Sequence, residues 1–145
     1  MKITSSIEIE NTPNEVFKWL ENPEKAKEWM SSVTETEILL ETANRVGTTF
    51  REIVEDDDGS MEMQGKITEF EANKLIAFHL ESRANVVDVE YSLEEMGEGA
   101  RLYYQADIRW KFPVNIMSIF IGKRIKKKIV DQLTDELDRL KLLCE

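Results

Sequence analysis

The sequence predicts an α+β fold in which an antiparallel sheet is covered by one long C-terminal helix. Three observations predict it. Short segments that alternate apolar and polar residues follow one another through the middle of the chain, separated by turn residues. Two helix starts lie close together near the N-terminus. The last strand, 100–110, leads into Pro113 and then into a long amphipathic helix, with no further strand.

The N-terminal segment is expected to form a strand followed by two short helices. Residues 3–10 alternate between two faces, which predicts a strand with one face inward. Thr12-Pro13-Asn14-Glu15 is a capping box with proline at the first helical position, so a helix should run from there to about Leu20. Asn22-Pro23-Glu24 repeats this signal, and a second short helix should run to about Trp29.

The middle of the chain is expected to form a series of antiparallel strands. The Asp58-Gly59 pair is typical of a tight hairpin turn, and Gly97-Glu98-Gly99 indicates another. Because strands joined by tight turns pair with their neighbours, the series favours an antiparallel sheet. The alternating segments are 33–40, 48–55, 61–67, 75–81, 87–94 and 100–110.

The last helix is expected to begin between Pro113 and Met117 and to carry a continuous apolar stripe. Such a stripe matches the apolar face of a one-sided sheet, and a sheet that curves around one helix often leaves space between the two. The stripe consists of residues at spacings of three and four, Met117, Ile121, Ile125, Ile129, Leu133, Leu137 and Leu140, and is widened by Ile116, Phe120 and Val130.

Length, charge and cysteine content limit the class of protein. The 145 residues, 41% of them apolar, are expected to form a single domain over 1–145. A net charge of −10 argues against broad nucleic-acid binding. We find neither a signal peptide nor an apolar run long enough for a membrane span. The single cysteine, Cys144, cannot form an internal disulfide, so we expect a cytoplasmic protein.

Several segments together resemble one known superfamily. They are 13–20 (PNEVFKWL), 23–30 (PEKAKEWM), 46–51 (VGTTFR), 65–78 (GKITEFEANKLIAF) and 99–102 (GARL), where alanine replaces the usual threonine. The chain resembles the SRPBCC superfamily, which includes START and birch-pollen-allergen-like proteins, and within it the polyketide cyclase/dehydrase group. This resemblance implies a helix-grip fold. Its seven-stranded antiparallel sheet curves around the long C-terminal helix, with two short helices between strands 1 and 2 and an apolar cavity inside.

Glu52 is the charged residue of most interest in the predicted cavity. It shares a strand face with Phe50, so the alternation directs its carboxyl inward, where burial would raise its pKa. Alternatively, the strand is short or bulged, and Glu52 reaches solvent. Tyr91 and Tyr104 either orient a ligand or are core tyrosines bonded to the backbone. The expected cavity residues are Phe50, Glu52, Met63, Phe78, Val89, Tyr91, Tyr104, Trp110, Met117 and Phe120.

The other residue types associated with catalysis or metal binding give little indication of either function in this sequence. His79, the only histidine, lies on the strand face opposite Phe78, so it should lie outside the sheet, which disfavours a histidine-centred triad. The acidic turn 56–60 does not fit the spacing of an EF-hand loop. With no cluster of cysteine and histidine either, we expect no metal and no cofactor.

One basic block interrupts the acidic sequence. Lys123, Arg124, Lys126, Lys127 and Lys128 follow Gly122 with no acidic residue among them. The block either contacts an anionic surface weakly or is a solvated helix face that balances the acids of the sheet. Gly122 in a helix interior indicates the close approach of another element, a bend, or room for a ligand. The oligomeric state is open.

The leading hypothesis is a non-enzymatic protein that binds or transports a small hydrophobic or amphipathic molecule, lipid-, polyketide- or quinone-like, in the cavity. A second hypothesis is an enzyme of the polyketide cyclase/dehydrase type that uses Glu52 and a cavity tyrosine for proton transfer. The third is a protein-interaction module, like the co-chaperone and ribosome-associated relatives in the superfamily. The ligand's identity cannot be derived from the residues.

Overall fold

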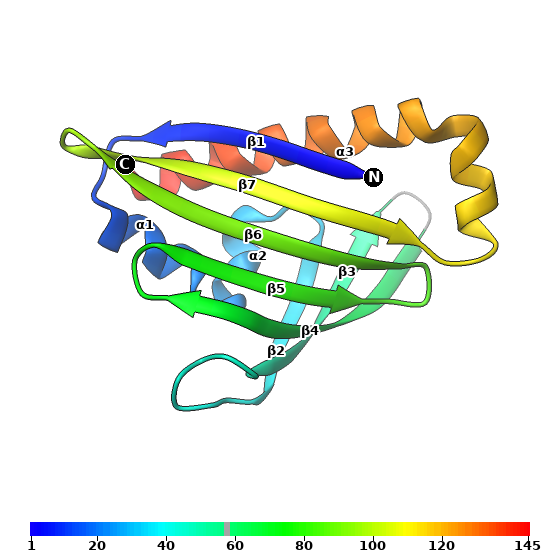
Figure 1. Ribbon diagram of the computed structural model, residues 1–145, viewed down its shortest axis with the longest axis horizontal. Helices are drawn as coiled ribbons and strands as arrows, with labels where there is room; N and C mark the ends of the chain where they lie inside the picture. Colours follow the sequence, from blue (N-terminus) through cyan, green and yellow to red (C-terminus); the bar gives the residue numbers. More distant parts are fainter. Residues whose placement is uncertain (57–58) are drawn as a thin grey trace.

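The computed structural model has a seven-stranded antiparallel sheet that curves around one long helix, the helix-grip arrangement (Figure 1). It describes residues 1–56 and 59–145, without the side chains of residues 56, 114 and 117–121. The strand order is β1-β7-β6-β5-β4-β3-β2. The elements are β1 (Lys2–Ile9), α1 (Pro13–Leu20), the 3₁₀ helix η1 (Pro23–Lys25), α2 (Ala26–Trp29), β2 (Val33–Leu40), β3 (Thr49–Asp56), β4 (Gly59–Glu71), β5 (Leu75–Glu81), β6 (Asn85–Met96), β7 (Gly99–Trp110) and α3 (Val114–Cys144).

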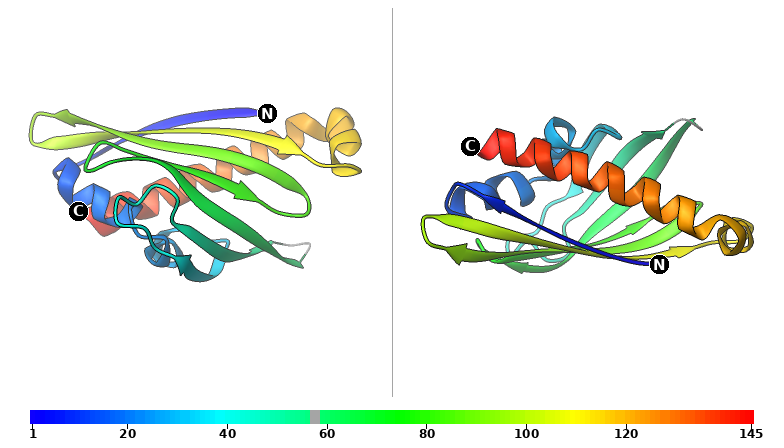
Figure 2. Two further views of the ribbon diagram at one scale, coloured as in Figure 1. Left: turned by 60° about the horizontal axis from the view of Figure 1, so that its bottom comes forward. Right: turned by 90° about the horizontal axis from the view of Figure 1, so that it is seen from above.

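The two N-terminal helix starts form as the capping signals predict. The Glu15 amide donates a hydrogen bond of 3.3 Å to Thr12 Oγ1, and the Glu24 amide donates one of 3.0 Å to Asn22 Oδ1. α1 buries Phe17, whose ring meets Phe70 of β4 edge-on at 5.6 Å between centroids. The short helices α1 and α2 therefore pack on the inner side of the sheet and close one end of it (Figure 2).

The sheet is a continuous antiparallel meander, with β1 added at the edge beside β7. Inward residues alternate with outward ones as predicted, most regularly on β6, where Val87, Val89 and Tyr91 are buried. The register shifts between Ile67 and Glu69 on β4, and twice between β2 and β3. Such irregularities increase the twist and bend of a strand. They accompany the curvature that lets the sheet wrap around α3 (Figure 2).

α3 covers the sheet with its C-terminal half. Leu133, Leu137 and Leu140 are buried there, as the apolar stripe predicts. The expectation that Ile116 and Val130 widen the stripe is wrong, because their side chains are 48% and 37% exposed. Figure 1 shows the first turns of α3 at an angle to the rest of the helix, beyond the end of the sheet. The N-terminal half of α3 thus does not seal the space above the strands.

The predicted hairpin at Asp58-Gly59 lies partly outside the described residues. β3 and β4 pair up to Asp56 and Gly59, so the two strands do meet at that point in the chain. Within the described part of the chain, no helix is long and apolar enough to cross a membrane.

Candidate functional site

A cavity of about 610 Å³ lies between the sheet and α3. Its walls come from the inner faces of β3 to β7, from the short helices and from the side of α3 that carries Ile129, Gln132 and Leu133. Exposed residues at the β3–β4 hairpin and the β5–β6 turn, Ser60 and Arg83 among them, also line it and mark its mouth. The cavity exists because the strands curve away from a helix that packs closely only along its C-terminal half.

Most of the residues proposed from the sequence line this one cavity. Those that the structure places there are Phe50, Glu52, Met63, Phe78, Val89, Tyr91, Tyr104 and Trp110. The side chains of Met117 and Phe120 lie outside the described part of the chain, so their places in the cavity stay predictions. Trp19 and Trp29, which pack the short helices, line the cavity as well.

Aromatic rings in edge-to-face contact form much of the cavity floor. Tyr91 is central, with ring centroids 6.0 Å from Trp29, 5.3 Å from Tyr104 and 6.3 Å from Phe78. Phe78 in turn meets Phe50 at 5.7 Å. Edge-to-face pairs at these separations stabilise the packing by more than the burial of their apolar area alone. The floor is therefore a preformed apolar surface contributed by β3, β5, β6, β7 and α2.

Glu52 is the unusual residue of the sheet wall. Its side chain lies on the inner face of β3 and is only 8% exposed. Within the described part of the chain, no group donates a hydrogen bond to its carboxyl. Burial raises the pKa of Glu52 to about 7, and the nearby charge of Glu136 contributes to the rise. The alternative that Glu52 reaches solvent at a strand end does not hold in this structure.

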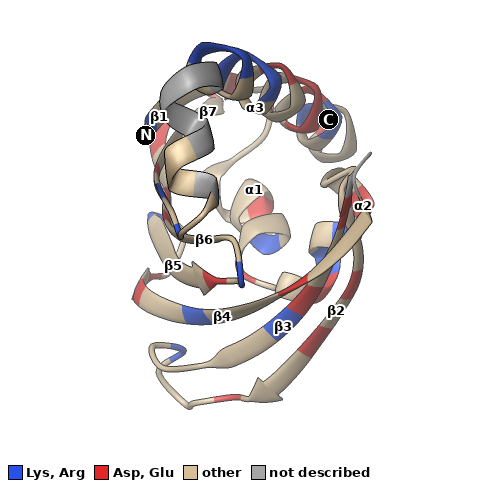
Figure 3. Ribbon diagram, turned by 90° about the vertical axis from the view of Figure 1, so that its right-hand side faces the viewer, with Lys and Arg blue, Asp and Glu red and all other residues tan. Residues whose placement is uncertain are grey.

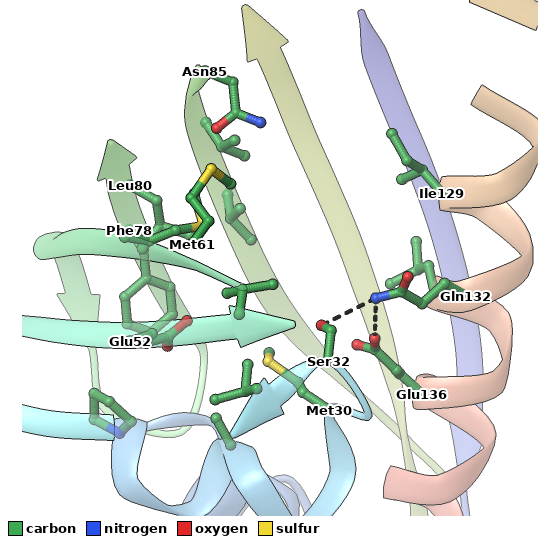
Figure 4. Close-up of a pocket in the computed structure, with 18 of the residues that line it drawn as sticks. Met30, Ser32, Glu52, Met61, Phe78, Leu80, Asn85, Ile129, Gln132 and Glu136 are labelled. Atoms are coloured by element: carbon green, nitrogen blue, oxygen red, sulfur yellow. Dashed lines mark hydrogen bonds between the residues drawn. The ribbon is translucent and has the colours of Figure 1, made fainter. Parts of the chain in front are cut away.

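Glu136 on α3 is a second buried acid, and we did not single it out from the sequence. Figure 4 shows it on the helix side of the cavity, with Glu52 on the sheet side. Gln132 Nε2 donates a hydrogen bond of 2.8 Å to Glu136 Oε1, and Ser31 Oγ is 3.5 Å from the same oxygen. Burial raises the pKa of Glu136 despite these donors. Its position three residues after Leu133 is the sequence signal that could have indicated an inward side chain.

The hydroxyls of Tyr91 and Tyr104 have no hydrogen-bond partner among the described residues. Burial raises the pKa of both phenols, and the neighbouring carboxyl of Glu136 adds to the effect. Both hydroxyls therefore remain neutral donors at physiological pH. Backbone bonding, the alternative weighed for these tyrosines, is not observed in this part of the structure.

His79 lies on the outer face of the sheet, as the strand alternation predicts. Its Nδ1 is 2.7 Å from Asp88 Oδ1, and Arg109 donates to the other oxygen of Asp88 at 2.7 Å. The histidine is thus part of a surface charge network, across the sheet from the cavity. It cannot act on a molecule held in the cavity.

Among residues 1–56 and 59–145, no three acidic, histidine or cysteine side chains are grouped closely enough to hold a metal ion. The acidic turn at 56–60 lies mainly outside the described residues. Glu52 and Glu136 are the acids that line the described cavity, and most of the other lining residues are apolar. The arrangement suits hydrogen bonding and charge pairing with an organic molecule.

The basic block occupies the outward side of α3 (Figure 3). Lys123, Arg124 and Lys126 are exposed, and Lys127 pairs with Asp131 of the same helix at 3.3 Å. A Cβ added at Gly122 would meet no atom of another element within 4 Å in the described part of the chain. The close approach of another element therefore does not explain this glycine. Two of the three explanations remain, the bend of α3 and room for a ligand.

Fold and cavity define a helix-grip protein with an internal, mostly apolar chamber. The whole chain, residues 1–145, matches the family described as "Polyketide cyclase / dehydrase and lipid transport". The protein belongs to this family, within the superfamily that the sequence resembles. No curated protein matches the chain in sequence.

Solved structures show the same fold at low sequence identity. TTHA0849 from Thermus thermophilus is similar, with a TM-score of 0.85 at 16% identity over 99% of this chain and 97% of that one. The Zhui aromatase/cyclase from a Streptomyces species gives 0.83 at 10% identity over 99% and 93%. A START superfamily protein from Mycobacterium smegmatis gives 0.80 at 17% identity over 98% of both chains. At these identities the likeness concerns the fold alone.

Proposed function

We propose that the protein binds a small hydrophobic or amphipathic molecule in the cavity and carries it, without chemical change. The cavity of about 610 Å³ is the observation on which the proposal rests. Its size lies within the range of small-molecule sites, and its lining combines many apolar side chains with a few convergent polar ones. Lipid-, polyketide- and quinone-like molecules fit this description, and residues 1–145 would act as one binding domain.

Two kinds of interaction would act on such a ligand. Apolar ligand surface removed from water contributes about 25 cal/mol per Å². The polar groups of Glu52, Tyr91 and Tyr104 would then fix the orientation, because none has a hydrogen-bond partner among the described residues. A ligand that satisfies them avoids the cost of leaving buried polar groups unpaired.

Calorimetric titration with a neutral amphipathic probe, 1-decanol, tests this function. We expect saturable binding near one molecule per chain. The variant Val89→Phe adds a ring to the cavity wall and should weaken binding, whereas Glu90→Phe adds the same ring to the outer face of β6 and should not. Unfolding curves of both variants confirm that they fold. Absence of binding to the wild-type protein, or an equal loss in both variants, would contradict the proposal.

An enzyme of the cyclase/dehydrase type is the second candidate. A pKa of about 7 for Glu52 favours it, because a carboxyl poised near neutral pH can both give and take a proton. The raised pKa values of Tyr91 and Tyr104 make them poor proton donors in such a reaction. In an enzyme, Glu52→Gln would abolish turnover while substrate still binds. In a carrier, the same change alters affinity only.

The basic block supports a second kind of contact, outside the cavity. The exposure of Lys123, Arg124 and Lys126 supports weak contact with an anionic lipid surface, and the exposed Phe112 and Ile116 precede them in the chain. Reversing those three charges should abolish sedimentation with anionic vesicles. Unchanged sedimentation would show that the block is a solvated face. The interaction-module hypothesis and the cytoplasmic location stay predictions.

A further inference from the structure

From the two buried acids we infer that the cavity selects an amphipathic amine, with the ammonium group held between Glu52 and Glu136 and the apolar part along the aromatic floor. This inference rests on the proposed function and adds the chemical class of the ligand. Figure 4 shows the two carboxyls on opposite sides of the same chamber, one from β3 and one from α3.

The charges that line the cavity are unbalanced. Glu52 and Glu136 are each only 8% exposed. Arg83 is the one basic side chain among the described lining residues, and it is exposed at the mouth. Outside the chamber, Arg139 favours the ionised form of Glu136 and Asp135 opposes it. The interior therefore lacks a counter-charge of its own, and a ligand cation would supply one.

The unpaired carboxyl oxygens point the same way, whereas the unpaired donors of the described lining, Trp29 Nε1 and Trp110 Nε1, remain available to an acceptor elsewhere on the ligand. Glu136 Oε1 accepts from Gln132 and Ser31, but among the described residues nothing donates to Glu136 Oε2 or to either oxygen of Glu52. An ammonium group has N–H donors only and no acceptor, and it carries three of them. Hydrogen bonds between ionised partners are about twice as strong as neutral ones. A primary amine thus matches both the number and the type of the unsatisfied acceptors.

Aromatic rings of the cavity wall add to the preference for an amine. Trp29, Phe78 and Tyr91 line the cavity in mutual edge-to-face contact. Aromatic faces attract cations, and the attraction is stronger where water is excluded. The rest of the floor is apolar and accommodates a hydrocarbon tail. A carboxylate ligand, in contrast, would bring a third negative charge beside two buried acids.

Three probes of equal chain length, decylamine, 1-decanol and decanoate, separate this inference from the proposed function. At pH 8 we expect decylamine to bind roughly tenfold more tightly than decanol, a difference that one charge-assisted hydrogen bond can supply. Decanoate should bind least. The amine's affinity should also rise from pH 6 to pH 8 as Glu52, with its pKa of about 7, ionises in the cavity, while that of decanol should not. The other titratable or charged groups near these acids are Tyr91 and Tyr104, whose raised pKa keeps them neutral, and Asp135 and Arg139 beside Glu136.

Matched variants distinguish the acid pair from the general negative charge of the protein. Glu52→Gln should remove most of the preference for decylamine over decanol. Glu55→Gln removes the same charge from an exposed site on the same strand and should leave the preference unchanged. If decanol or decanoate binds as tightly as decylamine, or if both variants lose the preference equally, the inference is overturned and the proposed function stands. If no probe binds, the proposed function itself fails.

Discussion

The ring of Phe50 on β3 lies directly over Gly65, its antiparallel partner on β4. A Cβ added at Gly65 would overlap the Phe50 ring and would come within 2.8 Å of Leu80 Cδ2. Phe50, Gly65 and Leu80 are neighbours on three adjacent strands, and both apolar side chains line the cavity. The glycine therefore allows the phenyl ring to lie flat against the sheet and form the cavity floor.

Gly65→Ala should destabilise the protein by about 1–3 kcal/mol, because the methyl group forces Phe50 out of a well-packed position. It should also weaken decanol binding, since the displaced ring enters the cavity. Chemical denaturation measures the first effect and calorimetry the second. Gly122→Ala is the control, because among the described residues its added methyl group meets no other element within 4 Å, and it should leave stability unchanged or raise it by up to about 1 kcal/mol. Equal stability of the Gly65→Ala variant and the wild type would contradict this packing.

The free energy of unfolding should fall as the pH rises from about 4.5 to about 7. Burial raises the pKa of Glu52 from 4.5 to about 7, so in this window the folded protein holds a proton that the unfolded chain has lost. By linkage, stability is lost with rising pH wherever the folded state binds more protons. The loss from Glu52 is on the order of 3 kcal/mol, at 1.36 kcal/mol for each tenfold change in proton affinity.

Urea denaturation of the wild type and of Glu52→Gln between pH 4.5 and pH 8 checks this dependence. The variant should be more stable than the wild type at pH 8 and similar at pH 4.5. Some slope should persist in the variant, because burial also raises the pKa of Glu136. A wild-type curve that runs parallel to that of Glu52→Gln would show that Glu52 titrates normally.

Leu137→Ala should cost about 2–5 kcal/mol, because Leu137 is 2% exposed at the contact between α3 and the sheet. Leu142→Ala on the same helix should cost less than about 0.5 kcal/mol, since its side chain is 77% exposed. The midpoints of urea unfolding report both values. Similar costs for the two leucines would mean that α3 does not pack on the sheet as described.

Much of the fold follows from local signals in the sequence. The Thr12 and Asn22 caps start helices where expected, and the alternation of β6 places Val89 and Tyr91 inward. Each of these signals depends on neighbours a few residues away, so it can be read without the tertiary structure. The exposure of Ile116 was not predictable in this way, because the helical period gives the direction of a side chain but not whether the helix reaches past the sheet.

The candidate site was predicted in part. The inward direction of Glu52 followed from its strand face. Its position across the cavity from Glu136 did not, because the two acids are far apart in sequence and face the same chamber only once α3 lies across the curved sheet. The volume of the cavity likewise depends on the curvature of the sheet and the bend of α3, which periodicity does not encode.

Mass spectrometry of the protein purified without denaturation shows whether the chamber holds a small molecule. Spectra are recorded under native and denaturing conditions for the wild type, for Val89→Phe and for Glu90→Phe. We expect a defined adduct near one per chain in the native spectra of the wild type and of Glu90→Phe, diminished in Val89→Phe and lost on denaturation. An adduct retained equally by Val89→Phe, or no adduct together with no uptake of added decanol, would contradict the proposed function.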